Sequence, residues 1–384
     1  MLNVAIIGTG AISPAHIEGY LQFPEKCRIV ALCDIYPDKA RQKANHYHLD
    51  AEIYADYTDM LHRTDIDLVS VCTPPYTHAQ IAIDFLNAGK HVLVEKPMAS
   101  SLQECDAMIG AAGKNQKILS VISQNRFRNP VMKLKRVLET NLIGPIVHTQ
   151  VDSLWWRGYS YYDLWWRGTW EKEGGGCTLN HAVHHIDMLL WMNGMPSEIV
   201  AVMGNAAHQN AEVEDISIAI CHYPHGGLAQ ITSSVIHHGE EQQLVFQGKY
   251  ARVSVPWKVI ASKAKENGFP ETDHELEARI QQTYAALPDI QYEGHTGQID
   301  DVLQALEGKK DVLVDGHQGR QTLELITAIY QSASLGQAVP LPLRPDSPFY
   351  TREGILKNAK YFYTKEKSID NFTVEEITTG GNYE

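Results

Sequence analysis

Residues 2–13 read LNVAIIGTGAIS, and this stretch decides the fold. Its first half is a short apolar run without the basic start of a signal peptide, so it predicts a buried strand. Its second half is a glycine turn, and Pro14 follows in the first turn of an expected helix. A strand that turns sharply into a helix is typical of the start of a dinucleotide-binding domain.

The glycine turn has the residues that a bound pyrophosphate requires, with one departure. Gly8 permits the tight turn, and Gly10 lets a pyrophosphate approach the backbone. Free N–H groups at the helix start, at Ala11 and Ile12, can donate to phosphate oxygens. Ser13 stands where a third glycine is usual. The alternative is an ordinary tight turn, but the position directly after the first strand favours a cofactor site.

An acidic residue, Asp34, ends the second expected strand. A carboxylate at this position accepts hydrogen bonds from the adenosine ribose hydroxyls. Its charge repels a 2′-phosphate, and residues 35–37 include no arginine. The sequence therefore predicts NAD rather than NADP as the cofactor, with a solvated aspartate before a turn as the alternative.

Strand-like and helix-like segments alternate over residues 2–123. This alternation indicates right-handed crossovers and a parallel sheet covered on both faces. The expected strands are 2–7, 28–33, 68–72, 91–94 and 118–122, and the expected helices are 14–22, 37–48, 78–88 and 102–114. Residues 1–123 are predicted to form a doubly wound α/β domain that binds NAD.

Two motifs stand directly after expected strands. Thr73, Pro74 and His78 belong to the segment TPPYTH, and Glu95 and Lys96 begin EKP. Ligands of open α/β sheets bind at the carboxyl ends of the strands, so both motifs are predicted to line the cofactor site. The lysine is also suited to bind a substrate hydroxyl, and the alternative for it is an ordinary surface lysine.

The pattern changes after about residue 126. Longer alternating runs joined by turns, such as the PHGG turn at 224–227, favour an open antiparallel sheet. These runs are 146–154, 198–207, 216–223, 228–236, 242–247 and 251–255, and helices are expected at 297–306 and 319–334. Residues 124–384 are predicted to form an α+β domain for substrate binding and oligomerisation. Past Asp346 the chain is polar and of uncertain order.

A histidine-rich segment follows three consecutive glycines. If it is helical, Asn180, His184 and Asp187 share a stripe that can face a cleft, and His181 and His185 lie beside it. Histidine in a cleft is suited to accept a proton, because its ordinary pKa is near 6.5. The spacing of the other two histidines also permits a metal site, but the glutamate of the zinc-protease helix is absent, so no metal is predicted. The structural alternative is histidines paired within a core.

Composition argues against several classes of protein. The 384 residues carry a formal net charge of -13 and no run of lysine or arginine, which disfavours nucleic-acid and anionic-membrane binding. Six scattered cysteines without a C-x-x-C pair fit free thiols in a reducing compartment. No apolar run approaches the roughly 18 residues of a membrane span. A cytoplasmic enzyme of two domains is expected.

Taken together, the motifs resemble those of the glucose-fructose oxidoreductase / inositol dehydrogenase / MocA (Gfo/Idh/MocA) family. In chain order they are GTGAIS, Asp34, TPPxxH, EKP, WRGxW before GGG, HxID and the run GRQTLELITAIYQSA, so the resemblance covers nearly the whole chain. It implies a Rossmann domain followed by an open-sheet domain, with Lys96 and His184 as catalytic partners beside the nicotinamide. Which of the two is the base stays open.

One catalytic position departs from the family pattern. In many members an aspartate lies four residues before the catalytic histidine, and here that position is Asn180. An amide cannot act as a carboxylate base or raise the pKa of His184 by its charge. It can still hydrogen-bond a substrate hydroxyl or orient the ring, so Asn180 is kept among the expected site residues.

The resemblance also directs the expectations about substrate. Trp166 and Arg167 belong to an aromatic stretch whose rings can stack on a sugar, and His295 is similar to a substrate-binding position of the family's sugar dehydrogenases. The leading expectation is oxidation at carbon 3 of a pyranoside. Inositol or another polyol, and glycoside cleavage through transient 3-oxidation, are the alternatives. A nucleotide-sensing regulator is disfavoured because both expected catalytic residues are retained. An open sheet is costly to expose, so a homo-oligomer is also expected.

Overall fold

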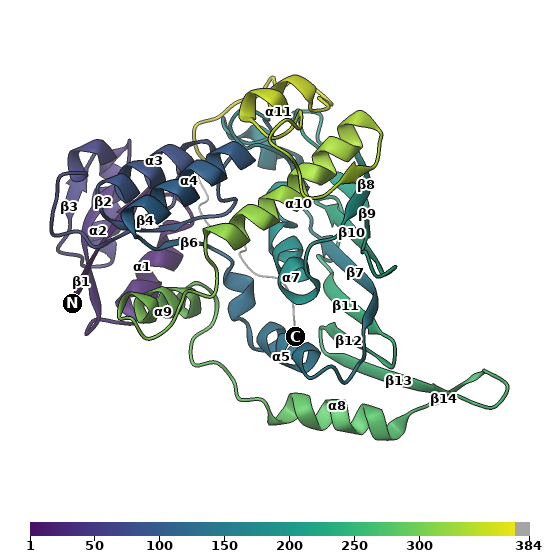
Figure 1. Cartoon of the computed structure of the whole chain (residues 1–384). Helices are drawn as coiled ribbons and strands as arrows, with labels where there is room; N and C mark the ends of the chain where they lie inside the picture. The colour runs from purple at the N-terminus through teal and green to yellow at the C-terminus, as the bar shows by residue number, and fades with distance from the viewer. Residues whose placement is uncertain (373–384) are drawn as a thin grey trace.

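The computed structural model describes residues 1–372, which are organised around two sheets (Figure 1). The first sheet has six parallel strands in the order β3-β2-β1-β4-β5-β6. Its strands are β1 (Leu2–Ile7), β2 (Cys27–Cys33), β3 (Glu52–Tyr54), β4 (Leu68–Val71), β5 (His91–Val94) and β6 (Leu119–Val121). The connecting helices are α1 (Ser13–Leu21), α2 (Pro37–His46), α3 (Pro75–Asn87) and α4 (Leu102–Asn115), with the 3-10 turn η1 (Tyr57–Met60). This confirms the predicted doubly wound Rossmann fold.

The inner strands are apolar because helices cover both faces of this sheet. β4 reads LVSV and β5 reads HVLV, and almost every side chain in them is buried. The strand order reverses at β1 and β4, so the loops after these strands diverge and leave a crevice at their carboxyl ends. The glycine turn follows β1 and the TPPYTH segment follows β4, so the fold puts both motifs at this crevice.

The second sheet has nine strands in the order β14-β13-β12-β11-β7-β10-β9-β8-β15. They are β7 (Ile146–Leu154), β8 (Glu198–Gly204), β9 (Ile216–His222), β10 (Leu228–Ser234), β11 (Gln242–Gly248), β12 (Ala251–Val255), β13 (Lys258–Ala264), β14 (Pro270–Thr272) and β15 (Val339–Pro340). All neighbours are antiparallel except β7 and β10, which are parallel. The prediction of an open, mainly antiparallel sheet is confirmed.

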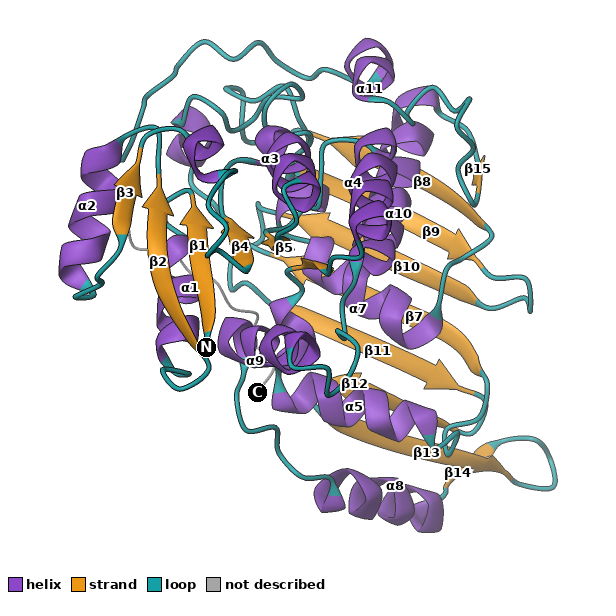
Figure 2. Ribbon diagram, turned by 60° about the vertical axis from the view of Figure 1, so that its left-hand side comes forward, coloured by secondary structure: helices purple, strands orange, loops and turns teal. Residues whose placement is uncertain are grey.

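Helices cover one face of this sheet (Figure 2). They are the short α6 (Cys177–Asn180), α7 (Val183–Asn193) and α10 (Gly316–Leu335), and α5 (Asn129–Glu139) packs over β12. The 3-10 turns η2 (Gln124–Phe127) and η3 (Tyr159–Asp163) complete this half. The other face carries exposed apolar side chains on three adjacent strands: Val200, Val202, Ile218, Ile220 and Leu228.

One helix of the C-terminal half packs on the N-terminal domain. α9 (Gly294–Leu306) lies against α1, where Gly19 leaves room for Ile299. Val302 and Leu303 share a buried cluster with Val4 of β1. The domain boundary between residues 123 and 124 stays a prediction.

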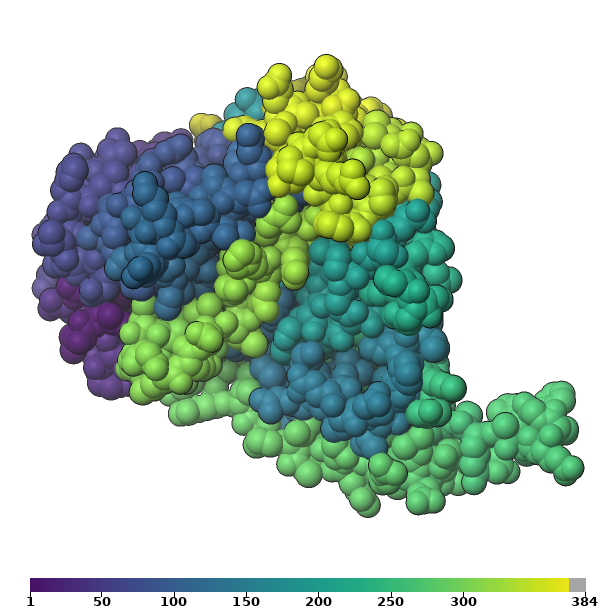
Figure 3. Space-filling view, viewed as in Figure 1, coloured from purple at the N-terminus to yellow at the C-terminus, as the bar shows by residue number. Residues whose placement is uncertain are grey.

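Several elements were not expected, among them the short strands β3 and β15. α8 (His274–Ala286) and the β13–β14 hairpin are exposed along most of their length, so no apolar periodicity signals them, and the hairpin projects beyond the rest of the molecule (Figure 3). Another is α11 (Arg352–Asn358), which lies in the polar tail. None of the helices within the described residues is long and apolar enough to cross a membrane.

Candidate active site

The glycine turn has the geometry that a dinucleotide needs. Gly8 has a φ of +91°, and a Cβ there would lie 2.7 Å from the carbonyl oxygen of Cys72, so only glycine fits. A Cβ on Gly10 would meet no atom within 4 Å, which leaves open space in front of the turn. Ala11 and Ile12 precede α1, whose first turn has no side-chain cap. The N–H groups of Ser13 and Ala15 already donate to the carbonyl oxygens of Gly10 and Ile12, so the N–H groups in front of them, at Ala11 and Ile12, are the ones suited to an anion.

Asp34 joins the end of β2 to the glycine turn. Its Oδ2 accepts hydrogen bonds from the backbone N–H of Thr9 at 2.8 Å and from the Thr9 hydroxyl at 2.9 Å. Its Oδ1 accepts from the backbone N–H of Tyr36 at 2.9 Å. A carboxylate has about four acceptor sites, so one is left for a ribose hydroxyl. The turn, the uncapped helix and this carboxylate together fit NAD.

His78 was expected to line the cofactor site, but its ring faces the protein interior. It is buried, and its ring lies between two backbone carbonyl oxygens, that of Pro97 at 2.9 Å from Nδ1 and that of Thr73 at 2.7 Å from Nε2. The ring therefore has no free nitrogen for a cofactor, and it ties the TPPYTH loop to the EKP loop. The half-exposed Thr73 and Pro74 are the residues of this loop that can reach a ligand.

Glu95 is buried between two histidines. Its Oε1 lies 2.9 Å from Nε2 of His16 and 3.3 Å from Nε2 of His295, and its Oε2 accepts from the backbone N–H of Lys96. Burial raises the pKa of Glu95, but the hydrogen bonds from the two histidines outweigh this and hold the pKa well below its usual value. Glu95 thus supports Lys96 and His295 rather than presenting a free carboxylate to the cofactor.

His16, Glu95 and His295 could together hold a metal ion. Among the described residues, they are the one group of at least three histidine, cysteine or acidic side chains close enough to do so. Their hydrogen bonds account for the facing atoms, and Nδ1 of His16 lies 3.3 Å from the Ser70 hydroxyl. The absence of a metal stays a prediction. Sequence reasoning missed His16, because a single histidine in an apolar helix gives no signal until its partner is known.

Lys96 reaches across to the second domain. Its Nζ donates to the backbone carbonyl oxygen of Asn180 at 3.1 Å. Burial lowers the pKa of Lys96 from its usual value, and the charge of Arg167 adds to this effect, while Glu95 opposes it. The carboxamide nitrogen of Asn180 donates to the Gly175 carbonyl oxygen at 3.2 Å, so this side chain is anchored to the glycine run.

His184 is buried on the first turn of α7. Within residues 1–372 no group hydrogen-bonds to its ring. Burial lowers its pKa well below 6.5, and the charge of Lys96 lowers it further, so the ring is neutral at neutral pH and can accept a proton. The structure therefore brings Lys96, Asn180 and His184 together.

The expected stripe through His184 does not face the cleft along its whole length. Asp187 forms a buried bidentate ion pair with Arg126, at 2.7 Å and 2.8 Å. Its role is to join α7 to η2. His185 is fully buried, and burial lowers its pKa to about 3. Asp187 is thus a core residue instead of part of a cleft-facing stripe, and His185 has the core position that was its structural alternative.

The aromatic stretch holds one arginine in a fixed position. The Arg167 guanidinium lies 4.3 Å from the ring centroid of Trp166 and 4.2 Å from that of Tyr161, and it donates to Glu173 at 3.1 Å. Burial raises the pKa of Glu173 to about 7, and the Arg167 charge opposes this. An arginine held by two aromatic rings and a carboxylate is preorganised for a ligand.

His181 lies in the same aromatic stretch. Its ring is in contact with those of Trp155 and Tyr161, and its buried Nδ1 has no hydrogen-bond partner in the described part of the chain. A buried polar atom without a partner is unusual and suits a ligand group. Sequence reasoning favoured a core role for His181, because only the fold brings it to Trp155.

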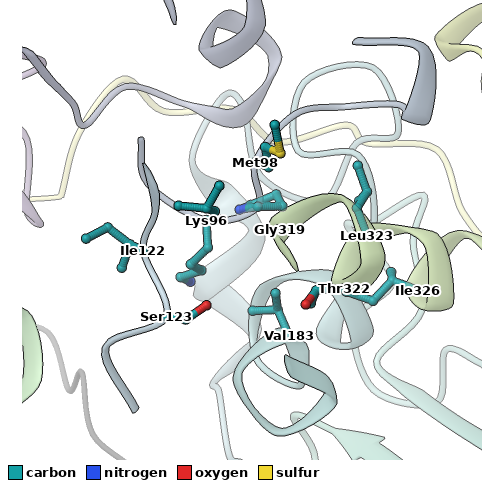
Figure 4. A pocket seen from close by; sticks show the side chains of 11 residues that line it. Lys96, Met98, Ile122, Ser123, Val183, Gly319, Thr322, Leu323 and Ile326 are labelled. Carbon is teal, nitrogen blue, oxygen red and sulfur yellow. The ribbon is translucent and has the colours of Figure 1, made fainter. Parts of the chain in front are cut away.

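A small cavity lies behind Lys96, lined mainly by apolar side chains such as Met98, Ile122, Val183 and Leu323 (Figure 4). Its volume is about 10 Å³, which holds at most one water molecule. It is too small for a sugar.

Comparison with known proteins agrees with this geometry. The sequence profile of an oxidoreductase family with an NAD-binding Rossmann fold, Gfo/Idh/MocA, matches residues 2–123, and the profile of the family's C-terminal alpha/beta domain matches residues 135–341. D-glucoside 3-dehydrogenase of Escherichia coli (strain K12) is 25% identical over 362 residues, which are 88% of this chain and 97% of that protein. The 2,7-anhydro-N-acetylneuraminate hydratase of Mediterraneibacter gnavus is 27% identical over 274 residues, 70% of this chain and 71% of that protein.

A solved structure gives the same result. The WlbA dehydrogenase of Bordetella pertussis, in complex with NADH and UDP-GlcNAcA, superposes with a TM-score of 0.77 at 28% identity and covers 89% of this chain and 98% of that one. Since both domain profiles match in order over most of its length, this chain belongs to the Gfo/Idh/MocA family and is an NAD-dependent oxidoreductase.

Proposed function

We propose that this protein oxidises a secondary hydroxyl of a sugar or glycoside, at carbon 3 of a pyranoside. The observation that carries the proposal is the contact of Lys96 with Asn180 beside the neutral ring of His184. These groups can bind and deprotonate an alcohol at the carboxyl end of β5. The relative named D-glucoside 3-dehydrogenase supports the choice of substrate and carbon.

The roles of the site residues follow from their charges. NAD, held by the glycine turn and Asp34, supplies the hydride acceptor when bound. Lys96 donates a hydrogen bond to the substrate hydroxyl and stabilises the negative charge that develops on its oxygen. His184 accepts the hydroxyl proton, for which its lowered pKa keeps it unprotonated. Asn180 keeps Lys96 in position through its backbone carbonyl oxygen.

The sugar itself is proposed to lie against the aromatic stretch. The indole of Trp166 offers a flat face, and Arg167 over this indole and His181 beside Tyr161 offer polar atoms. His295 is half-buried beside Glu95, so we assign it to the cofactor side of the substrate. Together with Lys96, which belongs to the first domain, these residues make the expected substrate contacts come from both domains.

Isotope labelling tests the proposal most sharply. Methyl glucosides carrying deuterium at carbon 3, or at carbon 2 as the matched control, are oxidised with NAD while NADH absorbance is followed. A slower reaction only with the carbon 3 label, in single turnover, supports the assignment. An effect only with the other label shows that the hydride comes from carbon 2. No NADH from any pyranoside, with turnover of inositols, contradicts the sugar assignment.

A second candidate is a reaction with no net oxidation. The relative named 2,7-anhydro-N-acetylneuraminate hydratase supports this candidate, because a hydratase adds water and does not oxidise its substrate. In such a reaction transient oxidation at carbon 3 acidifies the proton at carbon 2, a leaving group departs, and the hydride returns. Release of nitrophenol from nitrophenyl glucosides without accumulation of NADH distinguishes this reaction from simple oxidation.

We also propose that the chain forms a homo-oligomer and acts in the cytoplasm. The exposed apolar side chains on β8 and β9 support pairing of the open sheet face. All six cysteines are free and buried, which suits a reducing compartment. Replacing Val202 by glutamate should lower the mass measured by light scattering. Replacing Leu21, which is exposed on α1, by glutamate is the control and should leave the mass unchanged.

A further inference from the structure

The chain beyond α11 runs across the molecule as a defined segment. Residues 360–372, here called the tail strap, leave α11 and extend to the side of the Rossmann domain that carries α2 (Figure 2). They lie outside residues 135–341, which match the C-terminal family profile. The tail strap is therefore a feature of this chain to be explained from its own contacts.

The first part of the tail strap is anchored by a buried carboxamide. Oδ1 of Asn210 accepts hydrogen bonds from the backbone N–H groups of Glu366 and Lys367, at 3.0 and 2.9 Å, and its nitrogen donates to the Lys367 carbonyl oxygen at 3.0 Å. The Lys367 ammonium also pairs with the buried carboxylate of Asp163. These contacts fix the path of the strap.

The middle of the tail strap pairs with the aromatic stretch. The backbone N–H of Ile369 donates to the Asp163 carbonyl oxygen at 2.8 Å, and its carbonyl oxygen accepts from the N–H of Trp165 at 2.9 Å. The Trp165 ring in turn meets the ring of Tyr76 edge to face, with centroids 6.4 Å apart. Tyr76 lies in the first turn of α3, directly after the loop that follows β4, so Trp165 links the strap to this side of the cofactor crevice.

The far end of the tail strap reaches α2, the helix that follows the loop after β2. Oδ1 of Asn371 accepts a hydrogen bond from Nζ of Lys39 at 2.6 Å. Lys39 lies in α2, the helix directly after Asp34, and its ammonium is 5.0 Å from the ring of Tyr36. The strap thus extends from the β4 side of the crevice to the helix after β2.

The loops after β2 and β4 border the adenosine half of a dinucleotide bound to a Rossmann domain, with the ribose at Asp34. We infer that the tail strap is the outer wall of the adenosine site and has to move before the cofactor can leave. Opening it breaks the contacts of Ile369 and Asn371, so release of NAD or NADH is slow.

The test measures NADH release without any sugar substrate. Holoenzyme loaded with NADH is mixed with excess ADP-ribose, and the loss of NADH fluorescence gives the dissociation rate. A chain ending after Thr364 lacks most of the strap, and one ending after Phe372 retains it as the matched control. Because the shorter chain leaves Asp163 without its lysine, Ile369→Pro, which removes one backbone donor, is compared with Ile369→Ala, which keeps it.

We expect the chain ending after Thr364 to release NADH about tenfold faster or more, equal to ~1.4 kcal/mol. Ile369→Pro should change the rate in the same direction, while the control chain and Ile369→Ala keep the original rate. If Ile369→Pro melts at the original temperature and releases NADH at the original rate, the inference is wrong. Because no sugar is present, this outcome is independent of the proposed substrate.

Discussion

Nζ of Lys96 lies 3.1 Å from the backbone carbonyl oxygen of Asn180, so the two domains meet at a contact that does not depend on the side chain at position 180. This explains how an amide is accommodated where many relatives are expected to carry an aspartate. The backbone holds the lysine, and the lowered pKa of His184 already keeps the proton acceptor unprotonated.

Replacing Asn180 with aspartate tests that explanation. A carboxylate next to the ammonium raises the pKa of Lys96 and that of His184 by its charge. We expect the acid limb of the pH–rate profile to move to higher pH, with kcat at alkaline pH within about tenfold of the original because the backbone contact is kept. An Asn180→Ala variant, which adds no charge, should leave the acid limb unmoved.

Removing either proposed catalytic group should abolish most turnover. Lys96→Met and His184→Ala are each expected to lower kcat by about 10²- to 10⁴-fold, the range for loss of a positioned acid or base. NADH binding, measured by fluorescence titration, should change much less. Lys265→Met, in the projecting hairpin, is the control. Turnover near the original in both variants contradicts the proposed mechanism.

Two glycines of the first turn should respond differently to the same substitution. Gly8→Ala brings a Cβ to 2.7 Å from a backbone oxygen at a φ of +91°, so the melting temperature and NADH binding should both fall. Gly10→Ala meets no protein atom within 4 Å, so the protein should melt normally but bind NADH weakly, because the methyl group occupies the pyrophosphate approach. Unchanged NADH affinity in Gly10→Ala would place the phosphates elsewhere.

Asp34 should control the choice between NAD and NADP. Asp34→Asn keeps an acceptor for Thr9 but removes the charge that repels a 2′-phosphate. The dissociation constant of NADP divided by that of NAD should fall by about tenfold, or ~1.4 kcal/mol. Asp38→Asn, at the exposed start of α2, removes an equal charge and should leave the ratio unchanged.

The dependence of the rate on pH follows from His184. The neutral ring is the active form, and its pKa lies well below 6.5, so kcat/KM should stay constant as the pH falls through 6.5 and drop only in more acidic solution. Circular dichroism over the same range separates this drop from acid unfolding, to which the other buried histidines contribute. A midpoint at 6.5 or above in the folded enzyme contradicts a neutral, buried base.

Local patterns predicted what depends on neighbours in the chain. The apolar run before Gly8 and the acidic end of β2 reported the Rossmann domain, because a buried parallel strand and a phosphate turn constrain consecutive residues. Alternation in the second half reported the strands, but it could not distinguish the parallel pair of β7 and β10, because side chains alternate in the same way in both kinds of pairing.

The sequence by itself determined the fold class, the NAD-type turn with Asp34, and the family of the chain, whose motifs include Lys96 and His184. Only the tertiary structure decided that His78 and Glu95 face protein groups, that His16 contacts Glu95 and His181 lies in the candidate site, and that the polar tail returns to α2. The physical reason is that such contacts join segments far apart in the chain. Their energy comes from burial and hydrogen bonds that form only after the domains pack, so no local pattern encodes them.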